Sequence, residues 1–264
     1  MEKKYESKFH EELHINDESA KLQIVVDSRS KGELLIFLEN CQTFSFSVEM
    51  KESSNLTVFI QNKAEQEVSV QSNINMAKDS NCKMAVLDLQ KDKMIFENKV
   101  NLENQGAYYE LYTGQLCGKD VNKISNIEIQ HKADHTTGIM HNFAVLFDRS
   151  YYEMVANGNI DKCCAQSESH QETRVLTLGK DYKTKVIPLL LIDENDVKAS
   201  HALTIGQPDA SQLYYLQSRG LTPAQAMGLL SVGYFMPVIH VVKEESLRIQ
   251  LQEDMERKVG IYGN

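Results

Sequence analysis

The chain has 264 residues, of which 42% are hydrophobic and 25% charged, a composition typical of a folded protein and not of a disordered one. Its net charge of −9 argues against nucleic acid and anionic membrane surfaces as partners, since both are bound chiefly through Lys and Arg. No apolar run approaches the roughly 20 residues of a membrane span, and the charged N-terminus lacks the apolar stretch of a secretory signal. Together with five scattered cysteines, these features lead us to expect a cytoplasmic protein with reduced thiols.

Most of the chain before Pro188 has the pattern of β-structure. The absence of proline there suits a long hydrogen-bonded ladder, because proline removes a backbone donor. Strand-like runs recur at intervals of about 8–12 residues, at 22–26, 33–38, 44–49, 55–61, 67–71, 83–89, 94–102, 107–112, 123–130 and 140–147. In the run 94–102, Phe96, Val100 and Leu102 share one face, with Asn98 as its polar exception. The spacing permits a sandwich, a barrel or a β-helix, and no fixed-length repeat chooses among them.

Three helices are expected after residue 208. The first follows Asp209 and ends at Gly220, a residue suited to the position after a helix. The second begins at Thr222 with proline at its first position and a capping-box glutamine, and runs towards Pro237. The third, amphipathic helix spans residues 244–257 and presents one apolar stripe, consisting of Leu247, Leu251 and Met255.

Residues 193–220, DENDVKASHALTIGQPDASQLYYLQSRG, carry the most specific pattern: a strand, a short turn and a capped helix. The segment resembles the C-terminal signature of the SufB/SufD family of iron–sulfur cluster assembly proteins. The matching positions are Asp196, Val197, Lys198, Ser200, His201, Thr204, Gly206, Gln212, Leu213, Tyr215, Leu216, Ser218, Arg219 and Gly220. A fainter similarity reaches back through Pro188 and the run Ile129-Gln130-His131, so that the resemblance covers residues 125–245.

The resemblance implies a mainly β fold, a right-handed parallel β-helix core followed by a small C-terminal α-helical region. We therefore expect an N-terminal segment at 1–20, a β-helix core at 21–207 and a C-terminal helical region at 208–264. The chain is short for the family and leaves little room for the N-terminal helical domain of longer members.

His201 is the strongest candidate site residue, because an imidazole at a strand end can bind iron or move protons. The resemblance implies a role in cluster assembly at the interface between paired β-helix subunits; the alternative is a purely structural hydrogen bond. Iron–sulfur clusters are normally held by thiolates, yet the two family cysteine positions hold Ala199 and Tyr182. The chain therefore resembles SufD more than SufB. We expect iron or a cluster to bind only transiently, shared with a partner subunit and not held stably by this chain alone.

Cys163 and Cys164 are the only clustered cysteines. Neighbouring strand residues face opposite sides, so the pair is poorly placed to chelate one metal. This alternation allows one thiol to line the core and the other to be exposed, and of the two outcomes we expect burial in preference to an exposed reactive thiol. Both remain weaker candidate metal ligands. His131, His135 and His141 lie close together in the sequence, but we do not expect a three-histidine metal site and interpret His131 as structural.

The resemblance implies a non-catalytic component of a cluster assembly complex, not an enzyme. It also implies two partners: a SufC-type ABC ATPase, bound through the C-terminal helices, and a second β-helix subunit, either SufB-type or another copy of the chain. Ser218, Arg219, Gly220 and Thr222 are candidate ATPase contacts, and Arg219 is also expected to interact with helical carbonyls or an acidic residue. The sequence has no phosphate-binding glycine loop or nucleophile elbow.

Two other functions remain open. A structural β-helix interaction module that handles no metal would explain the missing family cysteines. A polysaccharide-acting β-helix enzyme is the weaker alternative, because the chain has no Trp for a sugar-binding platform and no recognisable secretion signal.

Overall fold

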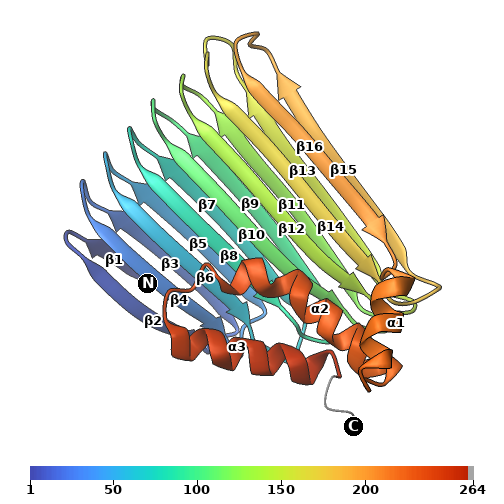
Figure 1. The fold of residues 1–264 in the computed structure, drawn as a ribbon. Helices are drawn as coiled ribbons and strands as arrows, with labels where there is room; N and C mark the ends of the chain where they lie inside the picture. The colour runs from blue at the N-terminus through green and yellow to red at the C-terminus, as the bar shows by residue number, and fades with distance from the viewer. Residues whose placement is uncertain (261–264) are drawn as a thin grey trace.

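The computed structural model describes residues 1–260, and these form a parallel β-solenoid with three helices at its C-terminal end (Figure 1). The odd-numbered strands make one sheet: β1 (Glu2–Tyr5), β3 (Ser19–Val26), β5 (Thr43–Met50), β7 (Val68–Met76), β9 (Met94–Leu102), β11 (Asn122–His131), β13 (Tyr151–Ile160) and β15 (Lys183–Ile192). The even-numbered strands make the other: β2 (Phe9–Ile15), β4 (Lys31–Leu38), β6 (Asn55–Asn62), β8 (Asn81–Asp88), β10 (Tyr108–Cys117), β12 (Thr137–Leu146), β14 (Glu168–Thr177) and β16 (Lys198–Gly206). The expected parallel β-helix with C-terminal helices is confirmed.

Side chains at alternate positions of each strand point inward and form the apolar interior of the solenoid. In β9, Phe96, Val100 and Leu102 are fully buried, and Asn98 is buried among them. The amide of Asn98 is satisfied there, because its oxygen accepts from the Tyr109 hydroxyl at 3.2 Å. All ten expected strand runs fall on strands of the solenoid. Each strand pairs in register with the strand two places later, so equivalent side chains stack in columns that run the length of the solenoid.

The solenoid begins earlier in the chain than residue 21. Strands β1 and β2 lie within residues 1–20 and already belong to the two sheets, β1 beside β3 and β2 beside β4. Leu13 and Ile15 of β2 are buried in the interior. The sequence of β2, FHEELHI, is mostly polar, and its short apolar alternation is a weak strand signal.

The three helices are α1 (Ala210–Ser218), α2 (Pro223–Ile239) and α3 (Glu245–Lys258). Their expected start signals are confirmed: the Asp209 side chain accepts from two backbone amides of α1, and Thr222 forms a capping box with Gln225. Gly220 has φ +97°, as expected for the residue that turns the chain after a helix. Helix α2 continues two residues beyond Pro237. Within residues 1–260, no helix has the length and apolar character needed to cross a bilayer.

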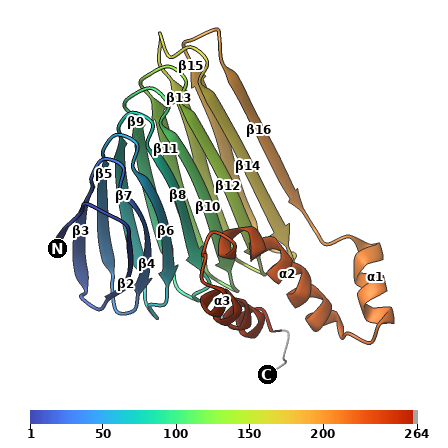
Figure 2. The same ribbon diagram turned by 60° about the vertical axis from the view of Figure 1, so that its left-hand side comes forward.

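Helices α2 and α3 fold back over the outer face of the even-numbered sheet (Figure 2). They bury a second apolar core, which includes Leu35, Phe37, Phe59, Leu87, Phe143, Val232, Phe235, Leu251 and Met255. Gly114 permits the close approach of α2, because a β-carbon there would lie 3.1 Å from side-chain atoms of Phe235 and Val238. Helix α1 buries no residue and stands away from both sheets (Figure 2).

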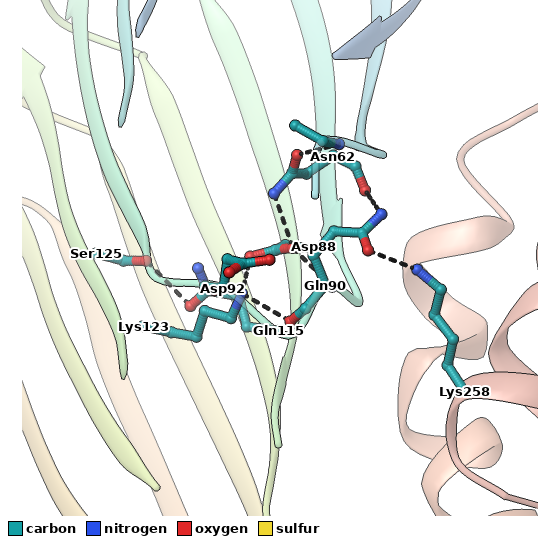
Figure 3. A network of polar contacts seen from close by, with 9 residues as sticks. Asn62, Asp88, Gln90, Asp92, Gln115, Lys123, Ser125 and Lys258 are labelled. Atoms are coloured by element: carbon teal, nitrogen blue, oxygen red, sulfur yellow. Dashed lines mark hydrogen bonds and ion pairs between the residues drawn. The ribbon is translucent and has the colours of Figure 1, made fainter. Parts of the chain in front are cut away.

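A buried polar network crosses the solenoid interior near its middle (Figure 3). The ammonium of Lys123 and the carboxylate of Asp88 form an ion pair in which both side chains are fully buried. Lys123 also donates to the carbonyl oxygens of Gln90 at 3.1 Å and Asp92 at 2.6 Å. Lys258 of α3 donates to the Gln90 side chain at 2.9 Å, so the network also ties the last helix to the solenoid.

Candidate functional site

The solenoid ends in an open coil formed by β15 and β16. Each of these strands has a neighbour on one side only in the described part of the chain. Three large apolar side chains remain exposed there, Leu191 (57%), Leu203 (41%) and Ile205 (41%). Free backbone donors and acceptors beside exposed apolar residues make this end a surface that can accept another β-structure.

His201 lies on β16 and faces the inside of this open coil. Two register pairs establish its direction: His170 is paired with Ser200, and Gln171 with His201. The His170 Nδ1 atom lies 2.8 Å from the Ser200 hydroxyl on the outer face of the sheet. Because successive strand residues point to opposite faces, His201 points inward, on the same side as the buried Gln171. The imidazole is exposed, and within residues 1–260 no further coil is stacked on β16 to cover it.

The two adjacent cysteines differ in exposure, so the expected burial holds for Cys164 and not for Cys163. Cys164 is buried, with its sulfur 3.4 Å from the His131 carbonyl oxygen, and burial raises the pKa of its thiol. Cys163 is exposed in the turn between β13 and β14, where its amide donates to the Glu194 carboxylate at 2.9 Å. Across residues 1–260, no three His, Cys, Asp or Glu side chains are grouped closely enough to hold a metal ion.

The three histidines near residue 135 occupy separate environments. His131 is fully buried in the solenoid, 2.8 Å from the Thr136 hydroxyl, and its burial lowers the pKa to about 4, so its ring is neutral. His135 lies in the following turn with φ +54°, beside Asp134. This turn separates the strand that holds His131 from the strand that holds His141. His141 belongs to the next strand and points to the outer face of the even-numbered sheet.

His141 forms a charged cluster that the sequence analysis missed. Its two ring nitrogens lie 3.6 Å and 3.3 Å from carboxylate oxygens of Glu110 and Glu172, on the strands either side. The hydrogen bond from His141, together with the Lys83 ammonium, lowers the pKa of Glu110 to about 2. Each glutamate is 31 residues from the histidine in the sequence. This spacing indicates that the side chains are neighbours only once the length of a coil is known.

The expected ATPase contacts lie at the corner between α1 and α2. The Ser218 hydroxyl donates to the Tyr215 carbonyl oxygen at 2.7 Å, and Thr222 caps α2. The sequence favoured contacts of Arg219 with helical carbonyls or an acid, and the structure places its guanidinium over the Tyr215 ring, 5.2 Å from the centroid. Tyr214 and Tyr215 are 77% and 56% exposed, which makes α1 a protruding aromatic surface that helical periodicity alone did not indicate.

Comparison with known proteins agrees with this architecture. The family model described as "SUF system FeS cluster assembly, SufBD core domain" matches residues 2–234. The iron–sulfur cluster assembly protein SufD of Bacillus subtilis is 31% identical over 182 residues, which are 69% of this chain and 42% of the relative. SufD of Escherichia coli is 28% identical over 99 residues, covering 37% and 23% of the two chains. A SufBD family protein of Mycobacterium tuberculosis is 25% identical over 164 residues, covering 60% and 19%. The matched region is therefore less than half the length of each of these relatives.

Proposed function

The chain belongs to the SufB/SufD family of iron–sulfur cluster assembly proteins and is SufD-like, and from this premise we propose that it is a non-catalytic subunit of a cluster assembly complex. In this proposal the open end of the solenoid pairs with a second β-helix subunit, either SufB-type or a copy of this chain. The C-terminal helices bind a SufC-type ABC ATPase. The nucleotide state of the ATPase then biases the geometry of the β-helix pair.

The open coil is the observation that carries the proposal. An end-to-end partner would cover the exposed side chains of Leu191, Leu203 and Ile205 and satisfy the free edges of β15 and β16. It would also close the space into which His201 points. A subunit interface at this end therefore brings a histidine of this chain to the partner without any rearrangement of the solenoid.

Iron or a cluster is the cargo of this proposed interface. An imidazole is a suitable ligand for iron, but a cluster normally requires four ligands that are mostly thiolates. The buried Cys164 has a raised thiol pKa, which disfavours the thiolate that binds metal. We therefore propose that His201 contributes to a shared, transient site and that the partner subunit supplies most of the thiolates.

Introducing negative charges at the open end of the solenoid tests the proposed pairing with a second β-helix subunit. Leu191→Asp combined with Leu203→Asp should abolish the β-helix pair while leaving the ATPase bound, because both residues are exposed on the last coil and neither belongs to the apolar core beneath α2 and α3. The measurement is the mass of the complex after co-expression with a SufB-type subunit and the ATPase. Ile249→Asp is the matched control, since Ile249 is 53% exposed on α3. A double variant that still pairs with the β-helix partner would exclude this interface.

The exposed tyrosines test the ATPase contact. Deleting all three helices is a poor test, because it uncovers the apolar core beneath α2 and α3. The double substitution Tyr214→Ala and Tyr215→Ala is a more specific test of ATPase binding, because α1 buries no residue and the fold should persist. The ATPase should be lost on co-purification and the β-helix pair retained. Unchanged ATPase recovery would move the docking surface elsewhere.

A structural module without metal handling is the second candidate, favoured by Ala199 and Tyr182 at the two family cysteine positions. The two functions differ in an anaerobic reconstitution with ferrous iron and sulfide. The proposed function expects chelator-labile iron on the isolated chain and retained iron in the complex. A complex whose iron content is the same with His201→Ala would favour the structural module.

A further inference from the structure

His201 is the last member of a column of register-paired side chains, and this column changes from apolar to polar near the open end of the solenoid. In the even-numbered sheet this column runs through Met84, Leu111 and Met140, all fully buried. The next position, on β14, is Gln171, and the last, on β16, is His201. Gln171 is only 4% exposed. A methionine would fill the same place without burying a polar group, so packing alone does not account for the glutamine.

The amide of Gln171 is held in one orientation. Its Nε2 donates to the Leu189 carbonyl oxygen of β15 at 2.8 Å, across the interior from one sheet to the other. Gly158 leaves room for the amide, because a β-carbon there would lie 3.2 Å from Nε2. With Nε2 fixed on β15, Oε1 is left as a buried acceptor, and it has no hydrogen-bond partner in the described part of the chain.

His201 is the residue placed to supply a donor to this oxygen. It is the register partner of Gln171 on the adjacent strand, and both side chains face the interior. Neighbouring strands lie roughly 4.8 Å apart, so an imidazole nitrogen of His201 can reach the amide oxygen by rotation of its own side chain. A neutral imidazole has one N–H donor and one lone-pair nitrogen, and a partner that binds the donor selects the tautomer.

We infer that Gln171 is the positioning residue of His201: its Oε1 accepts one ring N–H and thereby presents the other ring nitrogen, with its lone pair, towards the space closed by a partner subunit. This inference rests on the proposed role of His201. Outer hydrogen bonds of this kind orient metal-binding histidines and raise their basicity. Gln171 would touch neither the iron nor the partner and would act only through the imidazole.

The test compares three substitutions in the full chain, read by the ¹⁵N shifts of the His201 ring. Gln171→Met restores the residue type of the column and removes the acceptor, so the tautomer preference should be lost and ferrous iron binding should weaken roughly 10–100-fold. Gln171→Glu keeps an acceptor at the same place and should retain the preference. Thr173→Val is the matched control, because Thr173 is also 4% exposed and inward on β14 but is paired with Leu203.

The outcomes separate this inference from the proposed function. A tautomer ratio that is the same in the wild type and Gln171→Met would overturn the inference, as would an equal change in Thr173→Val. The His201→Ala variant assigns the resonance and tests the proposed function separately in the assembled complex. If the His201→Ala variant assembles clusters normally, the proposed role of His201 in binding iron is wrong. The ¹⁵N shifts of the His201 ring in the Gln171 variants still decide whether Gln171 orients the imidazole.

Discussion

An early coil of the solenoid, the one that contains β4, and a late coil, the one that contains β14, have the same strand arrangement but different interior side chains. Leu34 and Ile36 of β4 are fully buried among apolar neighbours. The same two columns hold Gln171 and Thr173 in β14. Of the ten buried side-chain atoms without a hydrogen-bond partner in residues 1–260, nine belong to residues from Gln115 onward. We therefore expect the early coils to contribute most of the stability of the fold. The buried polar groups without a hydrogen-bond partner lie mainly in the late coils, near the candidate site.

The largest effect is expected at the boundary between these regions, at the buried pair of Lys123 and Asp88. Lys123→Met should lower the free energy of unfolding by about 3–5 kcal/mol, because it leaves an uncompensated buried carboxylate. Adding Asp88→Asn should restore part of that loss, since no charge then remains buried. Chemical denaturation measures both variants. Lys185→Met, which removes an exposed pair with Glu153, is the control and should have a much smaller effect.

One column allows the two regions to be compared directly. Ile60 and Leu203 occupy the same inward column, the first fully buried and the second 41% exposed. Ile60→Ala should cost about 2–5 kcal/mol of unfolding free energy. Leu203→Ala should change the stability of the isolated chain by about 0.5 kcal/mol or less. Equal losses at the two positions would show that the last coil is packed as tightly as the early ones.

Acid should weaken the late coils through His131. Its pKa is lowered from 6.5 to about 4 by burial, so between these values the unfolded chain binds a proton that the folded chain does not. Stability from this group is present above pH 6.5 and is lost as the pH falls towards 4, at up to about 1.4 kcal/mol per pH unit. His131→Gln should flatten the stability profile over this range. A slope between pH 4 and 6.5 that is the same in His131→Gln and in the wild type would contradict this prediction.

The repeat was hidden from the sequence because the coils lengthen along the chain. Glu11 and Leu34 are register partners 23 residues apart, whereas Met140 and Gln171 are 31 apart. No single repeat length fits both separations. The alternation of apolar and polar residues could still be recognised within individual strands, because it does not depend on the repeat length. The helix caps at Asp209 and Thr222 could be read directly, because capping depends on neighbouring residues only.

The candidate site was only partly readable from the sequence for the same reason. His201 was identified by its motif, but its inward direction depends on the pairing of β14 with β16. Gln171 lies 30 residues earlier and carries no motif, so only the register reveals it. The cluster of Glu110, His141 and Glu172 was missed likewise, since its members meet only when three coils are stacked.

The smallest stability effect is expected at His201. The imidazole is exposed on the last coil of the solenoid, so His201→Ala should shift the unfolding free energy by no more than about 0.5 kcal/mol. Under the proposed function, cluster assembly by the complex should nevertheless fall, because the variant removes the imidazole that is proposed to contribute to the shared iron site. A melting curve measured beside complementation of a host lacking the gene separates stability from function. A structural histidine would give the opposite pattern: a loss of about 1–3 kcal/mol, with assembly falling only as the folded fraction falls.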